Sequence, residues 1–145
     1  MSVDPVQGVN YAARTDVGKV REHNEDCFCV NPELALYVVA DGMGGHASGE
    51  VASEIAVTTI EQQIKNGCDM VEAIEDAHVA ILQGVKSGRG KHGMGTTVVA
   101  VQMNGDDYTL AWVGDSRAYL WDDGLIQITK DHSMVQMLID TGQIT

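Results

Sequence analysis

Hydrophobic positions along the chain fall into short blocks, and the spacing within each block predicts a strand or a helix. The first blocks predict short strands at residues 11–15 and 26–30. A continuous apolar run over residues 34–40 follows, which is typical of a strand that is covered on both faces. We expect this third strand to stop at Asp41-Gly42.

The middle of the chain changes to helical spacing. Residues 48–65 place their large aliphatic side chains near one stripe, and Asn66-Gly67 is a stop signal. A second helix follows at once, because Asp69 and Glu72 form a capping-box pattern and the apolar positions keep helical spacing until Gly88. Two consecutive helices are therefore predicted.

From Gly95 onward the spacing returns to that of strands, with turn signals at Asn104-Gly105 and at Asp122-Asp123-Gly124. It predicts an antiparallel meander over residues 96–103, 108–113, 118–121 and 126–129. A last helix is expected from near Ser133. Strands, two helices and strands again favour an α+β fold with helices on one side of an antiparallel sheet. No repeat or Pro-rich linker divides the chain, so we predict that residues 1–145 form a single domain.

Composition and charge narrow the function. The 145 residues are 44% hydrophobic and 21% charged, which is typical of a folded protein of one domain. The net charge of −12 argues against a general affinity for nucleic acid or anionic membranes, and surplus carboxylates suit hard cations. Because no signal peptide or membrane-spanning run is recognised, we expect a soluble, unexported, cytoplasmic protein.

The three cysteines indicate neither a disulfide framework nor a structural zinc site. Cys27, Cys29 and Cys68 are an odd number without a paired C-x-x-C motif, which favours a reducing compartment. We interpret Cys27 and Cys29 as small buried hydrophobic residues, with a metal or redox role as the alternative. None of them has an arginine six positions later, which excludes the motif of a cysteine-based phosphatase.

The most informative stretch is Asp41-Gly42-Met43-Gly44-Gly45-His46. Ordering several glycines is entropically costly, so this cluster indicates positive φ angles or a close approach of a ligand to the backbone. A carboxylate held beside open backbone is a natural ligand for a hard metal ion. A glycine-rich turn capped by Asp41 is the structural alternative, and this stretch by itself favours neither.

Two further acidic segments follow or precede strands. Glu25-Asp26 lies close behind Arg21, whose planar guanidinium matches phosphate oxygens, and together they outline a site for a phosphoryl group. Asp115, in Gly114-Asp115-Ser116-Arg117, is delivered by another apolar strand. A solvated charge run and a tight turn are the respective alternatives. Three strand-associated carboxylate sites in one small domain nevertheless favour metal binding.

The order of these motifs resembles the bacterial branch of the metal-dependent protein phosphatases, also called the protein phosphatase 2C family. The resemblance runs from about Tyr11 to the last residue. It rests on five segments in sequence order: Arg21-x-x-Asn24-Glu25-Asp26, Asp41-Gly42-Met43-Gly44-Gly45-His46 with the following Gly49-Glu50 and Ala52-Ser53, Gly93-Met94-Gly95-Thr96-Thr97, Gly114-Asp115-Ser116-Arg117, and Thr129-x-Asp131-His132-Ser133.

Residue by residue, the resemblance implies roles for most of the acidic positions. Arg21 is implied to bind phosphate. Glu25 and Asp41 are implied to be direct ligands of a centre with two Mn²⁺ or Mg²⁺ ions, and Gly42 to be a ligand through its carbonyl. Asp26 is implied to contact these ligands rather than the metal.

The resemblance also implies a third, weaker metal site at Asp115 and a β-sandwich flanked by helices, in α-β-β-α layers. The implied reaction is hydrolysis of phosphoserine or phosphothreonine in proteins by a metal-activated water. A cognate Ser/Thr kinase is the implied partner. Met43 stands where animal members have a histidine, which leaves the general acid unassigned.

Two further metal aspartates of the family have no counterpart before Thr145, so we expect a domain truncated on its C-terminal side. Such a truncation leaves two other interpretations open. The first alternative is a non-catalytic module that recognises a phosphoprotein or a partner kinase. The second is a structural fragment that completes its sheet with another chain.

Overall fold

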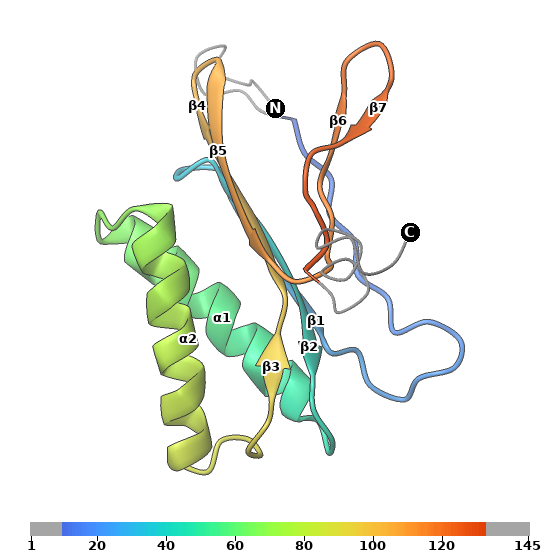
Figure 1. Cartoon of the computed structure of the whole chain (residues 1–145), viewed down its shortest axis with the longest axis vertical. Coiled ribbons are helices and arrows are strands. Elements are labelled where there is room, and N and C mark those ends of the chain that lie inside the picture. The colour runs from blue at the N-terminus through green and yellow to red at the C-terminus, as the bar shows by residue number, and fades with distance from the viewer. Residues whose placement is uncertain (1–9, 133–145) are drawn as a thin grey trace, which may run out of the picture.

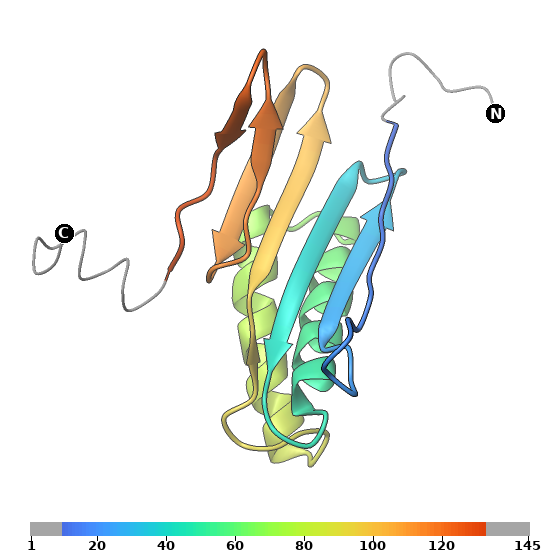
Figure 2. The ribbon, with the colours of Figure 1, turned by 90° about the vertical axis from the view of Figure 1, so that its right-hand side faces the viewer.

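Two helices pack against one face of an antiparallel sheet in the computed structural model, which describes residues 10–132 (Figure 1). The helices are α1 (Ser48–Lys65) and α2 (Met70–Lys86). Figure 2 shows both helices behind the sheet, and no helix of residues 10–132 lies in front of it. This arrangement confirms the α+β class and the prediction that the helices lie on one side.

The strands form one larger and one smaller sheet, and every pairing is antiparallel. The larger sheet has the order β1-β2-β4-β5, and β3 extends the pairing of β2 at one end. The smaller sheet is the hairpin β6-β7. The strand bounds are β1 (Asp26–Asn31), β2 (Leu36–Met43), β3 (Gly95–Thr96), β4 (Val98–Asn104), β5 (Asp107–Val113), β6 (Tyr119–Trp121) and β7 (Leu125–Gln127).

The core lies between the larger sheet and the helices. Alternate residues of β2 point into it, and Leu36, Val38 and Ala40 are buried. Ile60 of α1 is fully buried in the same cluster. Each such aliphatic side chain contributes about 1.5–3 kcal/mol when it is removed from water, so this layer is the main source of stability.

Local signals placed the helices correctly. Helix α1 has the predicted bounds, and the Asp69 carboxylate accepts a hydrogen bond from the Glu72 backbone N–H at 2.8 Å, which confirms the N-cap.

Cys29 is buried in the core, and Cys27 packs against it. Burial, with a hydrogen bond from the thiol to Glu61 at 2.7 Å, raises the pKa of Cys29 to about 12. Such a thiol behaves as a buried apolar group.

The predicted strand bounds need correction in two places. Residues 11–15 form no strand, because no neighbouring segment pairs with them; Tyr11 instead stacks obliquely on Tyr37, with ring centroids 6.0 Å apart. Strand β2 starts after a turn at Ala35, whose φ is 51°, and continues to Met43 because β3 pairs with its last residues. The strand therefore does not stop at Asp41-Gly42.

The prediction that residues 34–40 are covered on both faces is wrong for residues 10–132. Val39 is 48% exposed and Phe28 is 39% exposed, because they lie on the sheet face without helices. The meander is also divided, since β5 and β6 belong to different sheets. The described residues thus supply the helix layer, the larger sheet and the smaller β6–β7 sheet. The helix expected from Ser133 lies outside them.

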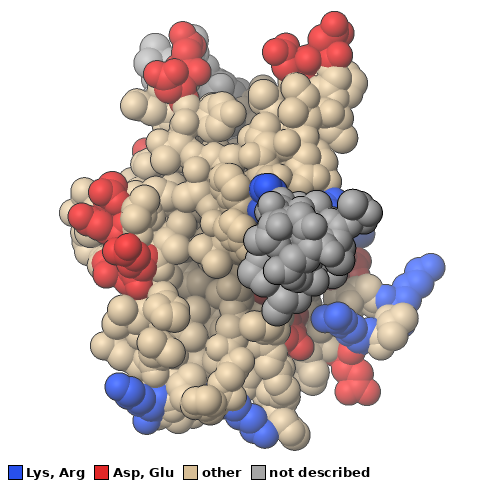
Figure 3. All heavy atoms as spheres, in the orientation of Figure 1, with Lys and Arg blue, Asp and Glu red and all other residues tan. Residues whose placement is uncertain are grey.

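The surface charge and the hydropathy of the helices bear on the sequence-based expectations. Among residues 10–132, no helix has the length and apolar character needed to cross a membrane. On the face drawn in Figure 3, acidic side chains occur in separate groups, and Lys and Arg gather toward the lower end and right side. The acidity is therefore not gathered into one broad patch on this face, and a metal site must be argued from individual carboxylates.

Candidate functional site

Two carboxylates meet where β1 begins and β2 approaches its end. Asp26 and Asp41 are partners in the β1–β2 register, so their side chains lie on the same face of the sheet. This is the open face, opposite the helices. Two like charges on neighbouring strands repel unless a proton or a cation lies between them.

The electrostatics of Asp41 show this crowding. Partial burial raises the pKa of the Asp41 carboxyl, and the carboxylates of Asp26 and Asp115 raise it further. Arg21 is exposed and lies close enough for its charge to oppose that rise. The structure therefore brings four of the predicted residues, Arg21, Asp26, Asp41 and Asp115, into one electrostatic neighbourhood.

The Glu25 side chain lies next to helix α1, unlike those of Asp26 and Asp41 on the open face. Its carboxylate lies against Gly49 in the first turn of α1, so closely that a Cβ at Gly49 would overlap it. The backbone carbonyl of Glu25 accepts hydrogen bonds from the Gly42 N–H at 3.0 Å and from the buried Ser53 hydroxyl at 2.8 Å. Glu25 is thus fixed through its backbone by β2 and by α1.

Gly42 is required for the same close approach. A Cβ at Gly42 would overlap the carbonyl of Gly49, so no other residue fits between β2 and α1 without a shift. Gly44 has a φ of 147°, and His46 and Ala47 also have positive φ angles. The predicted positive φ angles are confirmed, and the close approach that the structure shows is that of α1 to β2; Gly45 has open space around it.

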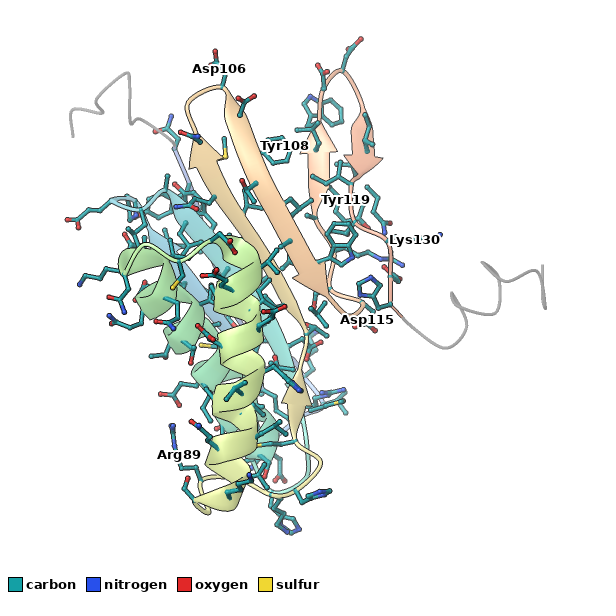
Figure 4. The ribbon with its side chains drawn as sticks, turned by 60° about the vertical axis from the view of Figure 1, so that its left-hand side comes forward. Arg89, Asp106, Tyr108, Asp115, Tyr119 and Lys130 are labelled. Atoms are coloured by element: carbon teal, nitrogen blue, oxygen red, sulfur yellow. The ribbon has the colours of Figure 1, made fainter. Side chains whose placement is uncertain are left out.

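Asp115 lies in the loop after β5, and Figure 4 shows it at the end of that strand. The loop is tied to the segment after β7 by a bidentate ion pair: Arg117 donates to Asp131 at 3.0 and 2.8 Å. The Gly114 N–H also donates to Nδ1 of His132 at 3.2 Å. These bonds hold the loop beside the end of the larger sheet.

One contact was missed by sequence reasoning. Thr97 lies between β3 and β4 and binds the backbone of Asp41, and its hydroxyl also contacts that of Ser116. Thr97 was noted as part of a motif, but nothing in its local pattern indicates a partner 56 residues away.

A cavity of about 230 Å³ lies beside this cluster; Asp26, Asp41, Ser116 and Arg14 line it together with apolar residues such as Phe28 and Val39. Oxygen donors of this kind suit Mg²⁺ and Mn²⁺, so the chemistry of the donors fits a divalent cation. Within residues 10–132, however, no group of three or more His, Cys, Asp or Glu side chains is arranged to hold a metal ion.

Comparison with known proteins gives matches over most of the chain. Residues 18–136 match the family described as protein phosphatase 2C. The chain is 42% identical over 144 residues to the serine/threonine protein phosphatase PstP of Mycobacterium tuberculosis, with 94% of this chain and 28% of PstP covered. It is 38% identical over 146 residues to the serine/threonine phosphatase stp of Listeria monocytogenes, with 91% of this chain and 58% of stp covered. The chain thus spans little more than half of the shorter relative.

Solved structures agree with the fold. The M. tuberculosis phosphatase PstP/Ppp superposes with a TM-score of 0.84 at 41% identity, covering 94% of this chain and 60% of that chain. The catalytic domain of PstP in complex with two manganese ions gives a TM-score of 0.82 at 40% identity, with 94% and 61% covered. MsPP of Mycobacterium smegmatis gives 0.77 at 32% identity, with 91% and 57% covered.

Proposed function

The chain belongs to the protein phosphatase 2C family, and on that premise we propose that it is the part of a metal-dependent serine/threonine protein phosphatase that binds metal and phosphate. The observation that carries the proposal is the meeting of Asp26, Asp41 and Asp115 with Arg21 at one end of the larger sheet. A carboxyl whose pKa is raised by burial and by neighbouring carboxylates, beside a guanidinium, fits a site for divalent cations and a phosphoryl group.

In this proposal, Asp41 and Glu25 hold two Mn²⁺ or Mg²⁺ ions together with the Gly42 carbonyl, and Asp115 holds a third, weaker one. Asp26 supports Asp41 from the neighbouring strand. When bound, two such ions lower the pKa of a water and neutralise phosphoryl oxygens. The support for manganese is the related PstP domain, which contains two manganese ions.

Arg21 is proposed to orient the phosphate of phosphoserine or phosphothreonine. Its guanidinium is exposed and close to Asp41, so it can contact a phosphate oxygen from the solvent side. The proposed partners are a phosphorylated protein substrate and a cognate Ser/Thr kinase, and the proposed location is the cytoplasm. The net charge of −12 supports neither nucleic acid nor an anionic membrane as a partner.

One observation favours a second function. Because no group of three or more potential metal ligands within residues 10–132 is arranged to hold a metal ion, this part of the chain also fits a non-catalytic module that binds a phosphoprotein or a partner kinase. The two functions differ in turnover but share the phosphate contact at Arg21.

Turnover of a phosphothreonine peptide with saturating Mn²⁺ separates the two functions. We expect slow turnover by the chain that is abolished in Asp41→Asn. The matched control is Asp106→Asn, since Asp106 is exposed in the β4–β5 turn at the far end of the sheet (Figure 4). Peptide binding without turnover would establish the binding module, and equal loss in both variants would refute the assigned site.

A further inference from the structure

Thr97 binds both backbone groups of Asp41. The Thr97 hydroxyl oxygen accepts a hydrogen bond from the Asp41 N–H at 3.0 Å, and the Thr97 N–H donates to the Asp41 carbonyl at 2.9 Å. One residue therefore satisfies the donor and the acceptor of the residue that carries the central carboxylate.

The place of Thr97 in the sheet is unusual. It separates β3 from β4, and both of these strands pair with β2 on either side of Asp41. At this break a side-chain hydroxyl accepts the hydrogen bond that a backbone carbonyl accepts in a regular ladder. Interruptions of a ladder commonly lie beside functional sites, because they re-aim the residue next to them.

The orientation of the Thr97 side chain is fixed from the other side. Its hydroxyl lies 2.5 Å from that of Ser116, and the two form a hydrogen bond. Gly114 has a φ of 102°, and a Cβ there would come within 2.6 Å of the Thr97 methyl carbon. The Thr97 methyl group thus occupies space that only a glycine leaves free, and its hydroxyl is held toward Asp41.

We propose that Thr97, supported by Ser116, is a positioning residue that fixes the backbone of Asp41. A fixed backbone keeps the Asp41 carboxylate beside Asp26 despite their repulsion. The same contact joins Asp41 to the loop that carries Asp115, so two parts of the proposed metal site share one support. The consequence for metal binding rests on the proposed function, but the contact itself does not.

Three substitutions test the proposal. Thr97→Val keeps the shape and removes the hydroxyl, Thr97→Ser keeps the hydroxyl, and Ser116→Ala removes only the supporting contact. Thr96→Val is the matched control, because the neighbouring Thr96 hydroxyl donates to the Thr97 carbonyl and does not contact Asp41. Circular dichroism and thermal unfolding identify any variant that fails to fold.

The first measurement is amide hydrogen exchange at Asp41 in the metal-free chain, observed by NMR. We expect exchange about fivefold faster in Thr97→Val, as befits the loss of one ordinary hydrogen bond, a smaller increase in Ser116→Ala, and nearly parental rates in Thr97→Ser and Thr96→Val. Unchanged exchange in a folded Thr97→Val would overturn the proposal, whether or not the chain binds metal.

The second measurement is Mn²⁺ binding, followed by paramagnetic broadening of the amide signals up to millimolar Mn²⁺. Residues that orient metal ligands typically alter affinity by 10–100-fold, so we expect about tenfold weaker binding in Thr97→Val and recovery in Thr97→Ser. Faster exchange with unchanged Mn²⁺ affinity would refute the functional role. Absence of Mn²⁺ binding by the parent chain would count against the proposed function instead, and the exchange data would then decide on the contact.

Discussion

The two faces of β2 come from alternate residues of one eight-residue strand, yet they differ in what surrounds them. Val38 points toward the helices and is 1% exposed, whereas its neighbour Val39 points to the open face and is 48% exposed. Asp41 shares the open face. The difference teaches that stability comes from one face and that the chemistry lies on the other, with the backbone of β2 as their only common part.

This common backbone explains how rigid packing reaches the acidic residues. Glu25 is held through its carbonyl by Ser53 of the helix layer, and Asp41 is held through its N–H and carbonyl by Thr97 of the sheet. In both cases the main chain is bonded while the side chain carries the charge. Changes on the helix side should therefore affect stability most, and changes on the open face should affect the site.

The largest effect is expected where the helix layer touches the site. In Gly49→Ala the new Cβ overlaps the Glu25 carboxylate and the backbone of Gly42, so we expect a loss of about 3 kcal/mol in the free energy of unfolding. Gly45→Ala is the control, because nothing lies within 4 Å of its Cβ position. Urea unfolding measures both, and equal stabilities would contradict the close approach of α1 to β2.

The valine pair on β2 tests the two faces directly. Val38→Ala opens a cavity in the core and should cost about 2 kcal/mol, whereas Val39→Ala, half exposed, should cost less than about 1 kcal/mol. Both substitutions replace valine by alanine in the same strand, so a change in β-strand propensity cannot explain a difference between them. If thermal and urea unfolding show equal losses, the open face is covered in solution and the contrast between the faces fails.

A smaller effect is expected at Ser53. Its hydroxyl is fully buried and donates to the Glu25 carbonyl, which also accepts from the Gly42 N–H. Ser53→Ala therefore leaves that carbonyl with one partner, and we expect a loss of about 1 kcal/mol. Ser53→Cys is the informative second variant, because Ser53→Thr would add a methyl group to a packed site. Urea unfolding measures the free energy of unfolding of both variants. If Ser53→Cys is as unstable as Ser53→Ala, the loss of the hydroxyl hydrogen bond explains the effect; if Ser53→Ala is as stable as the parent, this explanation is refuted.

The helices could be predicted from the sequence, because helix spacing and capping depend on residues that are close together in the chain. The bounds of α1 and the cap at Asp69 depend on residues within one or two turns, and both predictions are confirmed. The apolar run at residues 34–40 predicted a strand correctly, but a run of this composition does not tell which face is covered. Residues 11–15 have strand-like composition, but no strand within residues 10–132 pairs with them, so the predicted strand there is wrong.

The site was predictable in its residue types and not in its geometry. The sequence indicated Asp26, Asp41 and Asp115 as acidic positions, but their meeting depends on the β1–β2 register and on the loop after β5. The bonds from Thr97 to Asp41 join residues 56 positions apart, and only the folded sheet brings them together. The metal and phosphate roles of Arg21, Glu25, Asp41, Gly42 and Asp115 stay predictions.

The smallest effect concerns pH and charge on the open face. Burial and the nearby carboxylates of Asp26 and Asp115 raise the pKa of Asp41 above its value in the unfolded chain. The folded state then binds more protons than the unfolded state between those two pKa values, so stability falls as the pH rises through that interval. At neutral pH without divalent ions, the ionised Asp41 therefore destabilises the fold slightly.

Asp41→Asn removes this charge, so the metal-free variant should unfold at a slightly higher temperature than the parent at pH 7. The gain should shrink as the pH is lowered through the raised pKa, because the parent then becomes protonated at Asp41. Mg²⁺ should raise the unfolding temperature of the parent more than that of the variant, since a ligand stabilises only the state that binds it. Calorimetric scans at several pH values, with and without Mg²⁺, measure both differences. A variant that is less stable than the parent at pH 7 without metal would show that Asp41 is stabilised by its neighbours, and the repulsion on the open face would then be the wrong description.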